Sequence, residues 1–112
     1  MALRAIKGAA TVKSNTKEDI WQAARFLVTE LCSKNQVHKE NLCTIIFSST
    51  KDLTAAYPSE GVNTLPFFTK NPFPIFDTQH TNIDDGRAMC IRVLILVDID
   101  KDYKDIINID ID

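Results

Sequence analysis

The run Cys90-Ile91-Arg92-Val93-Leu94-Ile95-Leu96-Val97 constrains the fold more than any other stretch of the chain. Its β-branched and other apolar residues predict a strand over 89–98 that is buried within a sheet. The part without a charge, 93–97, is far shorter than the ~20 residues that a membrane-spanning helix needs. We therefore expect a sheet covered by helices and no membrane segment. Arg92 is the one charge in this run, which makes it a candidate functional residue.

The N-terminal third of the chain contains a strand pattern followed by a helix pattern. Residues 3–7 alternate apolar and polar side chains, as a half-buried strand does, and 8–10 are expected to end that strand. Thr16, followed three residues later by Asp19, approximates a capping box, and apolar residues then recur at helical spacing. The sequence predicts a helix over about 17–34, with Asn35 as its stop.

The remaining elements are shorter. Residues 42–49 are rich in β-branched and aromatic side chains, which favours a second buried strand. A helical segment is expected to start at 50–52, and Pro58 and Gly61 should divide it into two short helices. The other expected elements are a short strand at 75–77, a turn at 82–86, a weak helix at 101–108 and the start of a last strand at 109–111.

The order of these elements describes an α/β (α+β) fold with one mixed sheet and helices on one face. A chain of 112 residues has the size of one domain, so we expect a single domain over 1–112. The segment 63–74 is loop-like and contains three aromatic residues. We expect them to pack against the core, with a pocket or a subunit interface as the alternatives; they are Phe67, Phe68 and Phe73.

Charge and cysteine content exclude several function classes. The chain carries 13 Lys and Arg against 15 Asp and Glu, and its segment 98–112 is acidic. Nucleic-acid or anionic-membrane binding is therefore not expected. Three cysteines without a CxxC pair, and an N-terminus without an apolar leader, favour reduced thiols and a cytoplasmic location. The two histidines, His38 and His80, show no metal-ligand spacing, so no metal is expected.

Three stretches of the chain together resemble one protein family. They are Arg-Ala-Ile-Lys-Gly-Ala-Ala-Thr-Val at 4–12, Ser-Ser-Thr-Lys-Asp-Leu-Thr-Ala-Ala-Tyr-Pro at 48–58, and Cys-Ile-Arg-Val at 90–93. In this order and at these separations they resemble the small trimeric chorismate mutases of the α/β type, over about 3–107. The resemblance implies a pseudo-α/β-barrel homotrimer whose active sites lie in clefts between subunits. It also implies an isomerase of aromatic amino-acid biosynthesis that converts chorismate to prephenate by a [3,3] rearrangement without a cofactor.

This reaction explains why the family needs cations. Chorismate carries two carboxylates, and its breaking ether oxygen gains negative charge in the transition state. A fixed cation beside that oxygen stabilises the transition state more than the ground state. By the resemblance, Arg92 takes this catalytic role, and Lys7 stands where the family has an arginine that grips a carboxylate. Lysine keeps the charge but not the bidentate fork. Without the resemblance, both side chains could simply point to solvent.

The resemblance also implies a set of substrate-binding residues. Tyr57 takes the place of an aromatic wall, with ordinary packing beside Pro58 as the alternative. His80 stands where the family has a glutamate that accepts a hydrogen bond from the ring hydroxyl, and Asp77 stands where it has a cysteine. Either Asp77 supplies the lost carboxylate or the site holds another ligand, and His80 is either an acid or base of the site or a surface loop residue. The remaining substrate-binding candidates are Ser59, Ile75 and Phe76.

Other positions depart from the family in charge. Glu60 and Asn63 replace a lysine and an arginine, and Asp110 replaces a tyrosine, all of which should weaken binding of a dianion. Three hypotheses follow. The first is an active chorismate mutase with an altered site. The second is a repurposed or non-catalytic trimer that binds a different, less anionic small molecule in the intersubunit cleft. The third is an interaction or structural module whose sheet edge is protected by aspartates.

Overall fold

The computed structural model describes residues 2–66, 68 and 73–110. These residues form one four-stranded sheet in the order β1-β4-β2-β3. β1 and β2 both run antiparallel to β4, and β3 runs parallel to β2. The strands are β1 (Leu3–Thr11), β2 (Leu42–Ser49), β3 (Ile75–Gln79) and β4 (Cys90–Asp98). The helices are α1 (Lys17–Lys34) and α2 (Pro58–Asn63), with 3-10 turns η1 (Lys39–Asn41) and η2 (Tyr103–Asp105).

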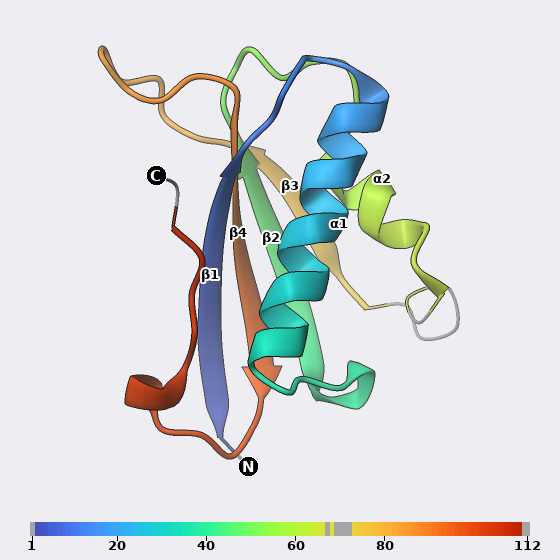
Figure 1. Cartoon of the computed structure of the whole chain (residues 1–112), viewed down its shortest axis with the longest axis vertical. Coiled ribbons are helices and arrows are strands. Elements are labelled where there is room, and N and C mark those ends of the chain that lie inside the picture. Colours follow the sequence, from blue (N-terminus) through green and yellow to red (C-terminus); the bar gives the residue numbers. More distant parts are fainter. Residues whose placement is uncertain (1, 67, 69–72, 111–112) are drawn as a thin grey trace.

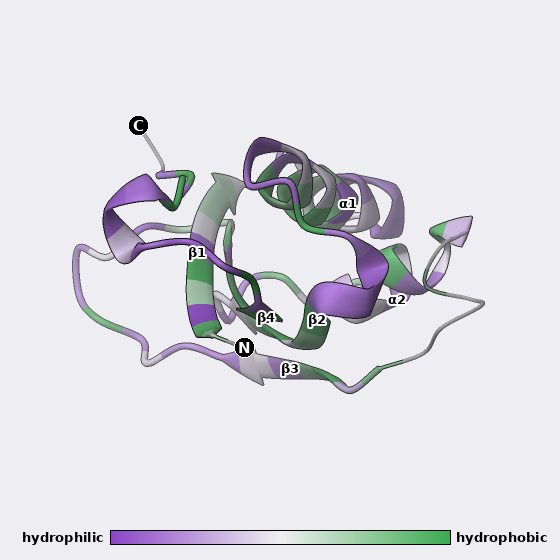
Figure 2. Ribbon diagram, turned by 90° about the horizontal axis from the view of Figure 1, so that it is seen from below, coloured by the Kyte–Doolittle hydropathy of each residue, from purple (hydrophilic) through white to green (hydrophobic). Residues whose placement is uncertain are grey.

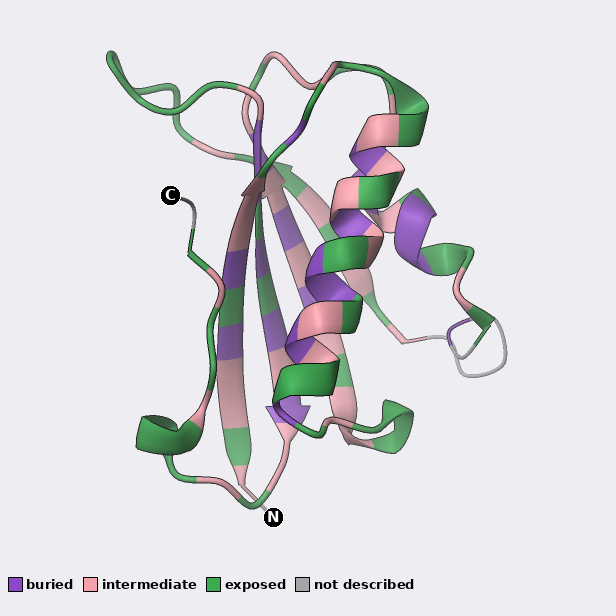
Figure 3. Cartoon of the chain, viewed as in Figure 1, coloured by how far each residue is buried: buried purple, intermediate pink, exposed green. Residues whose placement is uncertain are grey.

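Both α-helices lie on the same face of the sheet, and among the described residues the opposite face carries no helix (Figures 1 and 2). The predicted mixed sheet with helices on one face is therefore confirmed. β4 lies at the centre, between β1 and β2, because it is the most apolar strand. Alternate residues of β4 are buried against α1 (Figure 3), namely Ile91, Val93, Ile95 and Val97.

The long helix α1 has the bounds that the sequence predicted. Thr16 Oγ1 accepts a hydrogen bond from the Asp19 backbone N–H at 3.3 Å, which caps the first turn. Asn35 follows the last turn and is only 1% exposed. Its side-chain amide donates to the Leu31 and Ile107 carbonyls, and its Oδ1 accepts from the Ile107 N–H at 2.8 Å. Asn35 thus ends the helix and ties the C-terminal segment to it.

Strand β1 is longer than the sequence predicted. The expected end at 8–10 is wrong, because pairing with β4 continues to Thr11. Gly8 lies inside the strand, where α1 approaches closely. A Cβ at this position would lie 2.9 Å from Leu31 Cδ1 and 3.3 Å from Leu27 Cδ2. The glycine therefore admits the helix rather than ending the strand.

The segment between β2 and α2 also differs from the prediction. Residues 51–52 form a turn, not a helix, because the Thr50 and Asp52 side chains bond across to the backbone that leads into β4. α2 is a single helix that begins at Pro58, where the missing proline N–H costs no hydrogen bond. Gly61 lies within α2, where a Cβ would come within 2.8 Å of the Trp21 backbone.

The C-terminal segment runs beside the outer edge of β1 (Figure 1). Only η2 is helical there, so the expected helix over 101–108 is wrong in length. The expected last strand is a single parallel bridge between Gly8 and Ile109, and Ile111 lies outside the described residues. The Ile109 N–H donates to the Lys7 carbonyl at 3.1 Å, and the Ala9 N–H donates to the Ile109 carbonyl at 3.0 Å.

The smaller predictions mostly agree with the structure. The strand expected at 75–77 extends to Gln79, and the turn at 82–86 closes with a 3.0 Å bond from the Gly86 N–H to the Ile83 carbonyl. Phe68 is buried and meets Phe73 edge-on with ring centroids 4.6 Å apart, as expected for core packing, whereas Phe67 lies outside the described residues. In the described part of the chain, no helix is both long and apolar enough to cross a membrane.

Candidate active site

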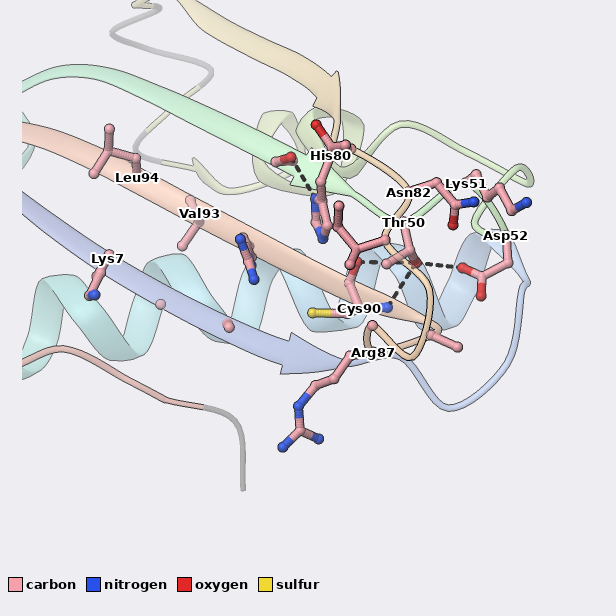
Figure 4. Close-up of a pocket in the computed structure, with 18 of the residues that line it drawn as sticks. Lys7, Thr50, Lys51, Asp52, His80, Asn82, Arg87, Cys90, Val93 and Leu94 are labelled. Carbon is pink, nitrogen blue, oxygen red and sulfur yellow. Dashed lines mark hydrogen bonds between the residues drawn. The ribbon is translucent and has the colours of Figure 1, made fainter.

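The helix-free face of the sheet is hollowed into an open groove of about 1230 Å³. The groove lies where β1 and β2 end and β4 begins. The turn after β2, the loop before β4 and the C-terminal segment complete its walls (Figure 4). Three of the residues predicted for the site line it, and we call them the groove group: Lys7, His80 and Arg92.

The strand register places Lys7 and Arg92 on the same face. Arg92 pairs with Ala9, two residues from Lys7, and side chains two residues apart on a strand share a face. Both side chains are exposed, and neither forms a hydrogen bond or an ion pair with the described residues. Two free cations thus face one groove, an arrangement suited to an anionic ligand.

His80 follows β3 directly and turns into the groove. Its backbone N–H donates to the Ser49 carbonyl at 3.0 Å, and its ring Nδ1 lies 2.6 Å from Ser48 Oγ. Ser48 pairs across the strands with Arg92, so His80 is held beside that cation. Partial burial, and then the charge of Arg92, lower the pKa of His80 below its usual value. The imidazole is therefore neutral at neutral pH.

The other predicted residues lie at β3 and the start of α2, and we call them the β3-edge group: Tyr57, Ser59, Ile75, Phe76 and Asp77. None of them lines the groove. Asp77 pairs with the buried Phe47, so it lies on the helix side of the sheet. It accepts hydrogen bonds from the Ser59 N–H at 3.0 Å and the Ser59 Oγ–H at 2.5 Å. Tyr57 and Phe76 are about two-thirds exposed, at 65% and 66%. One chain therefore does not bring Asp77 beside Arg92.

Sequence reasoning missed several groove residues. Ser48 carries no motif of its own, and only its register opposite Arg92 could have indicated it. Arg87 lines the groove from the loop before β4. The Asp52 carboxylate is already engaged within the chain. It accepts hydrogen bonds from Thr50 Oγ1 and, at 3.0 Å, from the Met89 N–H. The hydrogen bond from Thr50 is the main cause that lowers the pKa of Asp52.

Three features bear on chemistry that the site could perform. Asp110, one of the charge departures seen in the sequence, lines the groove. Burial raises the pKa of Cys90, which is not the environment of a nucleophilic thiol. Among the described residues, no group of three or more His, Cys, Asp or Glu side chains could hold a metal ion. The groove offers fixed charges and hydrogen-bonding groups instead.

Comparison with known proteins assigns the family. The family model described as chorismate mutase type I matches residues 3–110. The chain belongs to the chorismate mutase type I family. This confirms the resemblance that the motifs at 4–12, 48–58 and 90–93 indicated.

Individual members of the chorismate mutase family agree with this assignment. The chain is 31% identical over 100 residues to chorismate mutase AroH of Bacillus subtilis, covering 89% of this chain and 77% of the relative. It is 32% identical over 99 residues to chorismate mutase AroH of Thermus thermophilus, covering 88% and 79%. The solved chorismate mutase from Clostridium thermocellum matches with a TM-score of 0.89 and 32% identity, over 95% of this chain and 92% of that one.

Proposed function

We propose that this chain is a cytoplasmic, single-domain chorismate mutase that converts chorismate to prephenate without a cofactor. The observation that carries the proposal is the strand register that sets Lys7 and Arg92 on one face of one groove, where neither side chain has a hydrogen-bond or ion-pair partner among the described residues. A dicarboxylate whose ether oxygen becomes anionic in the transition state needs cations in this arrangement. Family membership supplies the reaction, and the groove supplies the groups for it.

Arg92 donates to the ether oxygen as the carbon–oxygen bond breaks. Because negative charge on that oxygen grows toward the transition state, the interaction lowers the barrier rather than only tightening substrate binding. Lys7 binds a carboxylate and so holds the enolpyruvyl arm folded over the ring, in a geometry close to that of the reaction. No covalent intermediate is required, because the rearrangement breaks one bond and forms the other within a single molecule.

The working unit is a homotrimer whose sites lie between subunits. The division of the site residues supports this: the groove group lines the groove, whereas the β3-edge group lies outside it, at the β3 edge of the sheet and the start of α2. In a trimer, the groove of one subunit faces the β3 edge of its neighbour. Tyr57 and Phe76, both largely exposed, then form an apolar wall over the substrate ring, and Ile75 supports it from the core side of β3. Ser59 and Asp77 form a hydrogen-bonded pair at its polar rim.

The test is the loss of ultraviolet absorbance of chorismate on addition of the purified protein. Arg92→Ala should reduce kcat by a factor of ~10²–10³, the loss typical when one such donor is removed. Arg25→Ala removes a cation of α1 that bonds to Thr64 and does not line the groove, and it should leave kcat unchanged. Size-exclusion chromatography should give the same oligomer for all three proteins. Undiminished turnover by Arg92→Ala would contradict the proposal.

A second candidate function is binding of a different small molecule in the same cleft. Its specific support is the groove chemistry: Asp110 adds an anion, and His80 replaces a carboxylate with a neutral ring. In that case, wild type should not consume chorismate, and a bicyclic dicarboxylate analogue of the transition state should not raise its melting temperature. Stabilisation by this analogue would instead favour the mutase.

A further inference from the structure

The contact between Ser48 and His80 is a feature of the groove that neither the motifs nor family membership explains. Ser48 Oγ lies 2.6 Å from His80 Nδ1, and the adjacent backbone fixes the same residue through the bond from the His80 N–H to the Ser49 carbonyl. Figure 4 shows the ring over β4, with Nδ1 on the dashed bond and Nε2 at the other side of the ring. The residue is therefore held at two points, its backbone N–H and its ring Nδ1, and Nε2 is left without a protein partner in the described residues.

A neutral imidazole has one donor and one acceptor nitrogen. Ser48 is the direct cross-strand neighbour of Arg92, so the ring that it binds lies near the guanidinium. The Ser48 hydroxyl can donate to Nδ1 or accept from it, and in the second case Nδ1 carries the proton of the ring. The lone pair is then on Nε2.

The other charged groups around the groove are not among the causes that shift the pKa of His80. They come from β1, the turn after β2, the loop before β4 and the C-terminal segment, namely Lys7, Lys51, Asp52, Arg87 and Asp110. Asp52 is engaged with Thr50 and Met89, and Arg92 is the charge that shifts the pKa of His80. The shift is downward, which keeps the ring uncharged at neutral pH.

We propose that Ser48 is a positioning residue that holds His80 as an Nδ1-protonated acceptor, so that Nε2 accepts a hydrogen bond from the substrate hydroxyl. This inference rests on the proposed function and adds a residue to it. The neutral Nε2 of His80 then accepts the hydrogen bond that a negatively charged carboxylate would accept at the same position. Because His80 is neutral, the groove carries one negative charge fewer than it would with a carboxylate at this position. This partly compensates for the negative charge that Asp110 adds.

The kinetic test compares pH profiles of kcat/KM. In wild type, kcat/KM should fall as the pH falls through the pKa of His80, which lies below the ordinary 6.5, because protonated Nε2 cannot accept. His80→Gln keeps an acceptor but cannot titrate, so this acid limb should disappear. Ser48→Ala should lower kcat/KM by roughly tenfold, the value of one hydrogen bond, and should shift the limb.

A matched control separates positioning from packing. Thr44 lies on the same face of β2 as Ser48, but its hydroxyl bonds to the Pro74 carbonyl. Thr44→Ala should leave the acid limb in place and cost less than threefold in kcat/KM. Equal losses in Ser48→Ala and Thr44→Ala, or an acid limb retained in His80→Gln, would overturn the proposal.

Nitrogen-15 NMR of the His80 ring tests the geometry without any turnover. Wild type at pH 7.5 should show the proton on Nδ1, and Ser48→Ala should lose that preference. If wild type does not consume chorismate, the proposed function fails, but this signature still decides the role of Ser48. A ring protonated on Nε2 in wild type, or one that Ser48→Ala leaves unchanged, would overturn the inference in either case.

Discussion

Asn35 shows how much one buried polar side chain contributes to this fold. Its side chain forms three hydrogen bonds within 2.9 Å. One is to the Leu31 carbonyl at the end of α1, and the other two are to the backbone carbonyl and N–H of Ile107. Sequence reasoning identified Asn35 as the end of the helix, because asparagine often follows a last helical turn. It could not identify the second role, because Ile107 is 72 residues away. Contacts of this kind depend on the tertiary fold and leave no local pattern.

We predict that Asn35→Ala lowers the free energy of unfolding by about 1–3 kcal/mol, because the Ile107 N–H loses its buried acceptor. Asn108→Ala is the control: it also removes an acceptor for a backbone N–H, that of Lys7, but at an exposed position, and should cost less than ~1 kcal/mol. Urea unfolding at one fixed protein concentration measures both. Equal losses would mean that the buried bonds add nothing beyond an ordinary exposed one.

At the scale of elements, the packing of α1 on the sheet depends on Gly8. Sequence reasoning placed the ends of α1 and of β2 correctly, since caps and apolar periodicity are local signals. It failed at Gly8, at Pro58 and in the C-terminal segment, because the packing of another element decided each case. Glycine and proline mark both ends and interiors of elements, and only the neighbouring element distinguishes the two.

Gly8→Ala is therefore expected to lower the free energy of unfolding by about 1–3 kcal/mol, since the added methyl would overlap Leu31 in a packed core. The same change should cost less in a Leu31→Ala background, where the overlapping group is gone. Denaturant unfolding of the four proteins in this double-mutant cycle gives the coupling. A cost independent of Leu31 would show that backbone strain, rather than the helix contact, is responsible.

At the scale of the whole molecule, the helix-free face of the sheet is the part that a trimer would use. Its apolar residues include Leu94, which is 37% exposed, together with Ala5, Ile46 and Leu96. The motifs pointed to the family and to the cations Lys7 and Arg92, whose shared face the register supports. They could not show that the β3-edge group lies apart from the groove group, because a motif contains no information on how distant its residues are in the folded chain.

We predict that Leu94→Asp converts the proposed trimer to smaller species, because it places a charge on the apolar face that its subunits would bury. Phe26→Asp, at a residue of α1 that is 50% exposed on the helix side, should leave the proposed trimer intact. Sedimentation velocity distinguishes these outcomes. A Leu94→Asp protein of unchanged mass would place the interface elsewhere.

Gly8 has one more consequence. Leucine side chains of α1 press on one side of this residue, and the groove opens on the other. At this point only the backbone of β1 separates the apolar core from the groove. Lys7 precedes Gly8 in the strand, and Ala9, which pairs with Arg92, follows it. A small movement of α1 would therefore reach the two cations directly, without passing through any intervening layer. The packing of the core and the positions of the two cations therefore depend on the same short part of β1.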